Sequence, residues 1–495
     1  MPDLLVDLET DHDDAPLYQR IADSIRSDVL SGRLRRGERV PSTRTLAREL
    51  KVNRNTVAQA YEQLVGEGFL EGRHGSGTYV ARELPQANFN TKSSRHTQQK
   101  LRRVAFANAP VAPKFYSHVL QAENPVSPPG VDIDMRLGAP DISAFPLRQW
   151  RRVIGNQLLV ARRDRMNYGS AYGLQELREQ IASYLGRARG IDCDYRNVLV
   201  TSGSQQGLWL AASLLVGKGD AVMMEDPGYL GARAIFNALG SVPVGVPVDQ
   251  DGADAAFVAR KLADGVSPKL LHLTPSHQYP TGVTLSAPRR MELLELASEH
   301  GFMIVEDDYD SEYRYEGRPA RALAGIDVAG AVIYVGSFSK VMYPSLRVGY
   351  VVAPEWLIEA MVSLRWHVDF MPPMLESAAL AQFIDEGHFE RHLRRMRTLY
   401  ADKREVFTRI LAEQLPGVLP DPVPPGGMKI MLNVPSHLTR QEAFERALNA
   451  GVRVYDQSVC YFEPAAAPKT LTIGFTALPI EKVKEAAFRL ARAWI

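Results

Sequence analysis

The sequence predicts a multidomain protein with a small N-terminal helix-turn-helix module, a linker and a large α/β domain. Residues 15–81 hold short helical patterns followed by a Gly-rich hairpin signal, and residues 82–130 lose hydrophobic periodicity. From residue 131, strand-like runs such as NVLVTSG and FMIVEDD alternate with helical patterns such as RRMELLELASEHG. This alternation indicates βαβ units and a mostly parallel sheet. We therefore expect domains at 15–81 and 131–495, joined by a linker at 82–130.

Length and composition indicate a soluble globular protein. At about 150 residues per domain, 495 residues suggest two to four structural units. Hydrophobic residues make up 45% of the chain and charged residues 23%. The two cysteines, Cys193 and Cys460, cannot build a disulfide framework, and no apolar run approaches the roughly 18 residues that span a bilayer. We expect a cytoplasmic protein without a membrane segment.

Opposite charge biases flank the small module. Residues 1–14 carry six acidic residues and no Lys or Arg, which indicates a solvated acidic tail and not a signal peptide, whose start would be basic. Residues 82–103 carry six Lys or Arg residues against Glu83 alone. The polar stretch from 82 to 130 is too long for a tight connection inside one compact domain, so we predict a flexible linker.

Within residues 15–81, apolar residues at helical spacing predict three helices. The first lies in PLYQRIADSIRSDVLSGRL and ends near Gly32. The second lies in VPSTRTLAREL, where Ser42 or Thr43 can cap the N-terminus. After the short turn KVN, the third lies in NRNTVAQAYEQLVGEG and presents Arg54, Asn55 and Thr56 in its first turn.

Two short helices joined by such a turn form a helix-turn-helix, whose second helix can enter the major groove of DNA. Arg can bond guanine bidentately, Asn can read adenine, and Thr can anchor a phosphate. The following FLEGRHGSGTYV predicts a two-stranded wing that brings Arg73 and His74 near the DNA backbone or minor groove. The alternative is a set of capped, solvated helix ends, since helix-turn-helix spacing alone gives many false matches.

The stretch PSTRTLARELKVNRNTVAQAYEQLVGEGFLEGRHGSGTYV resembles the winged helix of GntR-type bacterial transcription regulators nearly without a break. The resemblance implies binding of double-stranded promoter DNA. It places the DNA contacts at Arg44, Asn53, Arg54, Asn55, Thr56, His74 and Gly75.

In the large domain, polar segments follow the predicted strands. SGSQQ lies between a strand and a helix, where helix amides can hold a phosphate. Tyr229 in DPGY can stack on a flat heteroaromatic ring. Asp307 and Tyr309 lie at the carboxyl end of a strand, where α/β sheets place ligands. There a carboxylate can pair with a protonated ring nitrogen, and a tyrosine can bond a phenolate oxygen.

A metal site is the competing interpretation of the acidic stretch EDDYDSE. Its ligands would be Asp307, Asp308, Asp310 and Glu312. These acids lack the spacing and the glycine of a calcium loop, and no His cluster accompanies them. We therefore predict no metal.

The stretch YVGSFSKVMYP carries a candidate reactive amine. Lys340 can condense with an aldehyde, Ser337 and Ser339 can donate to a phosphate, and Arg347 can hold that phosphate through charge-assisted bonds. A lone lysine is usually a solvated side chain. The ordered series of phosphate turn, stacking Tyr, Asp with Tyr, Ser-x-Ser-Lys and Arg is not plausibly coincidental.

That series resembles, over residues 131–495, the fold-type I pyridoxal 5'-phosphate (PLP) enzymes of the aspartate aminotransferase superfamily. The resemblance implies a mostly parallel central sheet with a smaller C-terminal α+β part. It implies that Lys340 forms a Schiff base with PLP, that Asp307 keeps the pyridine nitrogen protonated and that Tyr309 bonds the phenolic oxygen. Tyr229 would stack on the ring. The implied phosphate contacts are Ser204, Gln205, Ser337, Ser339 and Arg347, with Tyr168 reaching the phosphate of a neighbouring subunit.

A GntR-type module joined to an aminotransferase-like body resembles the MocR subfamily, as do TPSHQYPTG, EDDYDSEYRYEG and GSFSKVMYPSLRVGY. This resemblance implies a homodimer that binds PLP. Two positions depart from the aminotransferase pattern. Tyr279 replaces the Asn that usually precedes Pro-Thr-Gly, and Thr472 replaces the Arg that in many of these enzymes binds the substrate carboxylate. Arg453 is either a substitute for that Arg or a surface residue.

The favoured hypothesis is a PLP-dependent transcription regulator. A small amino compound, or PLP itself, would alter the state of Lys340 and thereby change how the winged helices engage DNA. One alternative is a catalytically active PLP-dependent aminotransferase with an accessory DNA-binding module. A second alternative is a cofactor-free scaffold with a vestigial site.

Overall fold

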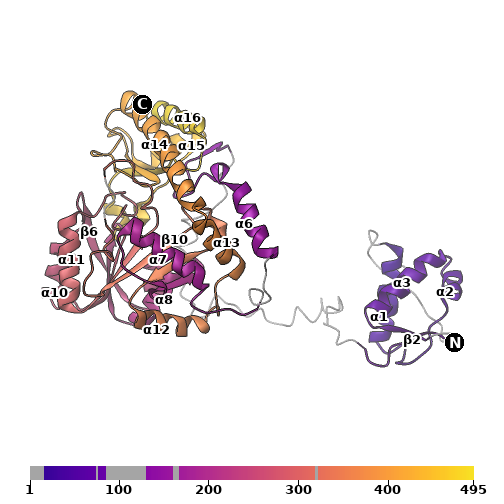
Figure 1. Ribbon diagram of the computed structural model, residues 1–495. Helices are drawn as coiled ribbons and strands as arrows, with labels where there is room; N and C mark the ends of the chain where they lie inside the picture. Colours follow the sequence, from indigo (N-terminus) through magenta and orange to yellow (C-terminus); the bar gives the residue numbers. More distant parts are fainter. Residues whose placement is uncertain (1–15, 74–75, 85–129, 160–166, 318–320) are drawn as a thin grey trace. The chain divides into compact units, whose positions relative to one another are not determined.

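The computed structural model describes residues 16–73, 76–84, 130–159, 167–317 and 321–495 (Figure 1). The chain divides into two compact units, residues 1–110 and 111–495. The acidic tail predicted at 1–14 and most of the linker predicted at 82–130 lie outside the described residues.

The described part of the first unit contains three helices and a two-stranded sheet. These elements are α1 (Leu17–Leu30), α2 (Thr43–Glu49), α3 (Arg54–Gly66), β1 (Leu70–Arg73) and β2 (Gly77–Val80). Ile25, Leu46 and Leu64, one from each helix, share a buried core. β1 and β2 pair antiparallel as a wing. The predicted winged helix-turn-helix is confirmed.

Side-chain caps fix where the two helices of the helix-turn-helix begin. Ser42 accepts a hydrogen bond from Thr45 N (3.1 Å) and caps α2, and Asn53 accepts one from Asn55 N (2.9 Å) and caps α3. Each cap satisfies a backbone N–H group that has no partner within its helix. The cap therefore gives the first turn of α3 a defined geometry, and Arg54 and Asn55 on this turn are exposed.

An eight-stranded sheet in the order β4-β11-β10-β9-β8-β5-β6-β7 forms the centre of the larger unit. Its strands are β4 (Val198–Thr201), β5 (Ala221–Asp226), β6 (Val242–Asp249), β7 (Gly252–Ala253), β8 (Pro268–Leu273), β9 (Met303–Asp308), β10 (Val332–Ser337) and β11 (Gly349–Val352). The run from β10 to β6 is parallel, whereas β11 pairs antiparallel with β10 and β4, and β7 pairs antiparallel with β6. The predicted mostly parallel sheet is confirmed.

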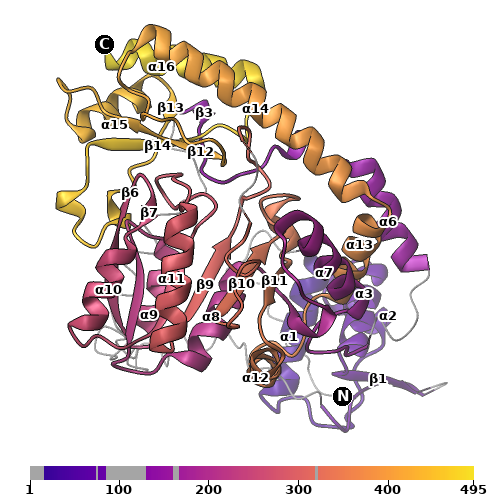
Figure 2. The same cartoon turned by 60° about the vertical axis from the view of Figure 1, so that its left-hand side comes forward.

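Both faces of this sheet are buried. On β9 and β10, Ile304 and Val332 belong to one apolar cluster, while the next residues, Val305 and Ile333, belong to another. Helices cover the two faces, with α8 and α9 contributing to one cluster and α10 and α11 to the other (Figure 2). This explains the continuous apolar runs of the central strands β9 and β10, because both of their faces are covered.

The helices of the larger unit are α6 (Leu147–Leu159), α7 (Gln175–Arg189), α8 (Ser204–Leu215), α9 (Leu230–Ala238), α10 (Ala255–Ala263), α11 (Ala287–His300), α12 (Glu355–Trp366), α13 (Met374–Asp385), α14 (His388–Gln414), α15 (Arg440–Asn449) and α16 (Ile480–Trp494). The long α14 packs against both α13 and α16.

A smaller α+β part holds the C-terminal residues and one segment from the start of the unit (Figure 2). β12 (Lys429–Asn433) pairs antiparallel with β14 (Thr470–Gly474), and β13 (Val452–Arg453) pairs parallel with β3 (Ile133–Asp134). Gly474 N donates to Met135 O (2.8 Å), which ties the chain just after β3 to β14. The C-terminal α+β part implied by the resemblance is thus present.

Candidate functional site

A helix N-terminus and a guanidinium group lie side by side at one end of the central sheet. Gly203 precedes α8 with φ of 123°, and a Cβ atom at Gly203 would lie 3.1 Å from Nη2 of Arg347. Arg347 itself has φ of 53°, in the left-handed region that non-Gly residues seldom adopt and that clusters at functional sites. Backbone amides at the start of α8, at Ser204, and the Arg347 charge together have the chemistry of a phosphate site.

The candidate reactive lysine lies in the turn after β10. A Cβ atom at Gly138 would lie 3.1 Å from Nζ of Lys340, so the amine rests against the backbone of the segment after β3. Ser337 Oγ accepts a hydrogen bond from Ser339 N (3.1 Å), which shapes the turn between β10 and Lys340. The structure therefore places Lys340 where the central sheet meets the smaller α+β part.

A buried carboxylate ends the neighbouring strand. Asp307 pairs in register with Val335 of β10 and is 4% exposed. Its Oδ1 has no hydrogen-bond partner among the described residues, and its Oδ2 lies 3.6 Å from Nε2 of the fully buried His272, whose ring nitrogens also lack partners there. A buried acceptor without a donor costs about 1–3 kcal/mol. This position can therefore accept a hydrogen bond from a ligand.

Three tyrosine rings surround the same region. The Tyr229 and Tyr279 rings meet edge to face at 5.5 Å, and the Tyr279 and Tyr309 rings do so at 6.3 Å. Gln205 Nε2 donates to the Tyr229 hydroxyl (2.8 Å), and the Tyr309 hydroxyl donates to His277 O (2.6 Å). Burial raises the pKa of Tyr309 well above its usual range, so its hydroxyl stays protonated.

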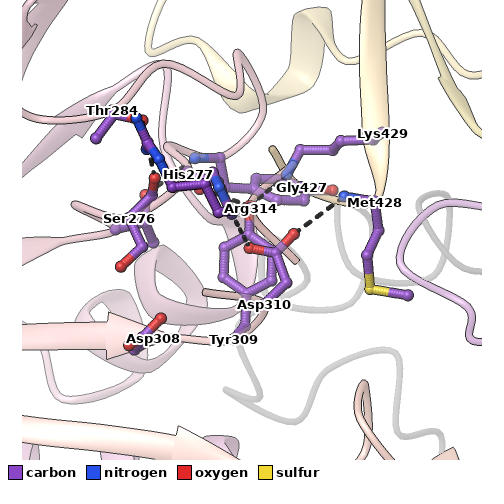
Figure 3. A network of polar contacts seen from close by, with 12 residues as sticks. Ser276, His277, Thr284, Asp308, Tyr309, Asp310, Arg314, Gly427, Met428 and Lys429 are labelled. Carbon is purple, nitrogen blue, oxygen red and sulfur yellow. Dashed lines mark hydrogen bonds and ion pairs between the residues drawn. The ribbon is translucent and has the colours of Figure 1, made fainter. Parts of the chain in front are cut away.

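Lys429, at the start of β12, extends toward Tyr309 (Figure 3). Its ammonium donates to the Tyr309 hydroxyl, and its Nζ lies 4.7 Å from the ring centroid of Tyr279 and 4.6 Å from that of Tyr309. Burial lowers the pKa of Lys429 to about 8; the charge of Asp310 opposes this shift and that of Lys340 adds to it. The two lysines are therefore close enough for their charges to interact.

The candidate metal ligands do not converge on one point. Asp310 accepts from Met428 N (3.2 Å) and contacts His277 Nδ1 (2.8 Å), which joins the chain after β9 to β12 (Figure 3). Asp308 pairs with Arg189 (2.8 Å), and Glu312 accepts from Tyr184 (3.1 Å). Within the described ranges, no group of three or more His, Cys, Asp or Glu side chains is placed to hold a metal ion.

The predicted DNA contacts lie on the first turns of two helices. Arg44 on α2 and Arg54 and Asn55 on α3 are exposed, and Thr56 is half-buried. Asn53 is exposed as well, but its side-chain oxygen is already used by the cap of α3. His74 and Gly75 lie outside the described residues.

The remaining predicted residues have contrasting environments. Tyr168 is 80% exposed and its ring lies 6.3 Å from that of Phe370. Thr472 is 1% exposed, and its Oγ1 has no hydrogen-bond partner among the described residues. Arg453 lies 3.6 Å from Asp134 and over the ring of Tyr455. In the described part of the chain, no helix has the length and apolarity needed to cross a membrane.

Sequence reasoning missed Lys429, His272 and Gly138. Lys429 precedes the apolar run IML, and His272 interrupts the run LLHL; a polar residue beside apolar strand residues is the one signal that could have marked them. Gly138 has φ of 58°, but a glycine in RLGAPD carries no signal beyond an ordinary turn.

Comparison with known proteins gives matches to both units. Residues 132–490 match the family "Aminotransferase class I and II", and residues 17–80 match "Bacterial regulatory proteins, gntR family". The "Probable rhizopine catabolism regulatory protein MocR" of Rhizobium meliloti is 34% identical, over 97% of this chain and 94% of that protein. The "HTH-type transcriptional regulator TauR" of Rhodobacter capsulatus is 32% identical, over 96% of each chain.

A solved structure similar to this chain is LysN, an alpha-aminoadipate aminotransferase from Thermus thermophilus in complex with N-(5'-phosphopyridoxyl)-L-leucine. It superposes with a TM-score of 0.68 at 28% sequence identity, over 76% of this chain and 94% of LysN.

Proposed function

Because the chain belongs to the MocR-type transcription regulators, in which a GntR-type helix-turn-helix is fused to an aminotransferase class I and II domain, we propose that its larger unit senses a small amino compound, or PLP itself, through PLP held at Lys340. The observation that carries this proposal is the unpartnered, buried Oδ1 of Asp307, one strand away from the strand that leads to Lys340.

The residues present fit PLP. Arg347 and the amides at the start of α8 offer a cradle for the phosphate, and Tyr229 offers an aromatic face. Asp307 offers the acceptor for the pyridine nitrogen, and the Tyr309 hydroxyl, which already donates a hydrogen bond, can turn its donor toward a phenolic oxygen. When bound, PLP supplies an aldehyde that condenses reversibly with amines.

The chain's own groups would then control access and proton position. The buried Asp307 would favour a protonated ring nitrogen, because no other cation within hydrogen-bond distance competes for its Oδ1 among the described residues. Lys340 would supply the amine that an effector amine displaces. The contact between Asp310 and the amide of Met428 would pass a change at this pocket to the smaller α+β part.

A second candidate function, aminotransferase activity, is favoured by Asp307 and Tyr309 at the end of β9 and by Lys340 after the neighbouring strand β10. Sustained turnover of an amino acid with a keto acid, unaffected by deletion of residues 1–81, would establish it in place of sensing.

We also propose a homodimer. Tyr168, Trp366 and Phe370 are 80%, 50% and 50% exposed, and their rings lie together, with Trp366 and Phe370 5.3 Å apart. Exposed aromatic clusters of this kind are typical of interfaces. Each Tyr168 would then reach the phosphate site of the other protomer. Light scattering of wild type and Phe370→Ser tests this, and an unchanged monomer mass in both would contradict it.

The cofactor proposal is tested by titrating PLP into the full-length protein. We expect a visible Schiff-base absorbance band, trapped by borohydride reduction as a modified peptide that contains Lys340. Lys340→Ala should show neither signal. Asp307→Ala should bind PLP more weakly, since a charge-assisted hydrogen bond contributes about 1.5–3 kcal/mol. A band of equal intensity in wild type and Lys340→Ala would overturn the proposal.

A further inference from the structure

Lys429 is a buried ammonium group without an acidic partner. Two other buried cations of this unit pair with carboxylates, Arg189 with Asp308 (2.8 Å) and Lys403 with Asp141 (2.7 Å). Lys429 is 4% exposed, and within the described parts of the chain its recorded contacts are the Tyr309 hydroxyl and the rings of Tyr279 and Tyr309. Its ammonium therefore contacts aromatic faces directly, and Asp310, whose charge also acts on it, forms no ion pair with it.

These contacts compensate the burial of the charge only in part. An ammonium group has three donors, and one of them is used by Tyr309. Each cation–π contact contributes about 0.5–2 kcal/mol, whereas removing an ammonium from water costs several kcal/mol. An anionic ligand beside Lys429 would supply the missing compensation and would occupy the two remaining donors.

A second polar group on the same sheet face also lacks a partner. In the antiparallel pair of β12 and β14, Lys429 lies opposite Gly474, and Met431 lies opposite Thr472. Side chains two residues apart on a strand share a face, so Lys429 and Thr472 are diagonal neighbours on one face. The Thr472 hydroxyl is buried and has no hydrogen-bond partner among the described residues. Gly474, opposite Lys429, has no side chain, and the backbone of Arg136 and Leu137 packs against it.

Lys340 lies near this face of the β12–β14 pair. The charge of Lys340 acts on Lys429. The backbone of Met135 accepts a hydrogen bond from Gly474 of β14, and three residues later a Cβ atom at Gly138 would lie 3.1 Å from Nζ of Lys340. The buried cation is thus close enough to Lys340 for their charges to interact, and the unpartnered hydroxyl is its diagonal neighbour.

We propose that Lys429, with the hydroxyl of Thr472, forms an anion subsite that binds a carboxylate of the effector. The effector is then an amino acid and not a simple amine. This rests on the proposed sensing function at Lys340. The carboxylate-binding charge would then lie on β12 and not on the adjacent strand β14, where Thr472 occupies the position of the usual Arg.

The test measures binding by calorimetry to the full-length, PLP-loaded protein. The probes are glycine, L-alanine, β-alanine and 4-aminobutyrate, each paired with its primary amide, which keeps the amine and the chain length but lacks the negative charge. We expect at least one acid to bind wild type about tenfold or more tightly than its amide, a difference of about 1.4 kcal/mol. Lys429→Met should abolish this preference, and Lys429→Arg should retain most of it.

Arg453→Met is the matched control, because Arg453 is a nearby cation whose charge is already beside Asp134. It should keep the acid preference. Thermal unfolding and the PLP absorbance band report whether each variant is folded and loaded.

Two results would overturn the proposal. One is an acid preference that survives in Lys429→Met. The other is equal affinity of acid and amide for every pair in a wild-type protein that carries PLP. The first result is expected if Lys429 only positions Tyr309, because the acid and the amide would then weaken together. Failure of the wild-type protein to take up PLP would instead contradict the sensing function on which the proposal rests.

Discussion

The ion pair between Arg189 and Asp308 should be one of the most costly polar contacts to break in the larger unit. Arg189 ends α7 and Asp308 ends β9, their side chains are 5% and 0% exposed, and Nη2 lies 2.8 Å from Oδ2. Arg189→Met removes the charge and keeps the length of the side chain. Asp308 would keep the hydroxyl of Tyr334 (2.6 Å) but lose its cation. Removing one partner of a buried pair costs about 3–5 kcal/mol, and we expect that loss of unfolding free energy.

The same helix supplies a matched control. Arg187 lies 3.1 Å from Glu390, but these side chains are 59% and 30% exposed, so Arg187→Met should cost about 0–1 kcal/mol. Urea unfolding followed by tryptophan fluorescence measures both variants. All five tryptophans lie within residues 131–495, so the signal reports the larger unit. A loss in Arg189→Met no larger than that in Arg187→Met would refute the reasoning. Because Asp308 follows Asp307, the pair also holds the end of β9 that carries the candidate cofactor acceptor.

Three further predictions concern DNA binding and pH. Arg54→Ala should weaken binding to the cognate duplex by about 1–3 kcal/mol in a mobility-shift titration at fixed salt, and unchanged affinity and base preference would contradict a base contact. Burial lowers the pKa of His392 to about 4, whereas the ordinary pKa of histidine is about 6.5. Between these two pH values the unfolded chain therefore binds more protons than the folded protein. The free energy of unfolding of wild type should fall by up to about 3 kcal/mol as pH drops from about 6.5 to about 4. The free energy of unfolding of His392→Gln should fall much less over the same range. Burial likewise lowers the pKa of Lys429 to about 8, so the free energy of unfolding of ligand-free wild type should rise between about pH 8 and pH 10. Equal pH profiles of this free energy in wild type and Lys429→Met would refute this.

The sequence predicts the features that are local. Two examples are the strand end at Asp307 in FMIVEDD and the turn SFSK at Lys340. Both can be predicted because the apolar run and the polar residue are contiguous in the sequence. The winged helix is readable for the same reason, since Ser42 and Asn53 cap the helices that they precede. The DNA-contacting and cofactor-contacting roles of these residues stay predictions.

Features set by pairing between distant segments were not predictable from the sequence. Lys429 reaches the pocket because β12 pairs with β14, so its place depends on the register of Lys429 with Gly474. β11 reads as one more apolar strand, yet it runs antiparallel to β10. The link between them, residues 338–348, is shorter than the dozen or so residues that a parallel crossover requires.

The most direct test of the regulator hypothesis is the coupling between Lys340 and DNA. The affinity of PLP-loaded wild type for a duplex selected from genomic fragments is measured at fixed salt, with and without the tightest-binding amino acid of the calorimetry panel, and again with Lys340→Ala. We predict that the amino acid changes the affinity of wild type about fivefold or more, that DNA changes the affinity for the amino acid by the same factor, and that Lys340→Ala shows no change. An amino acid that binds wild type without altering its DNA affinity, or that alters the DNA affinity of Lys340→Ala equally, would contradict it.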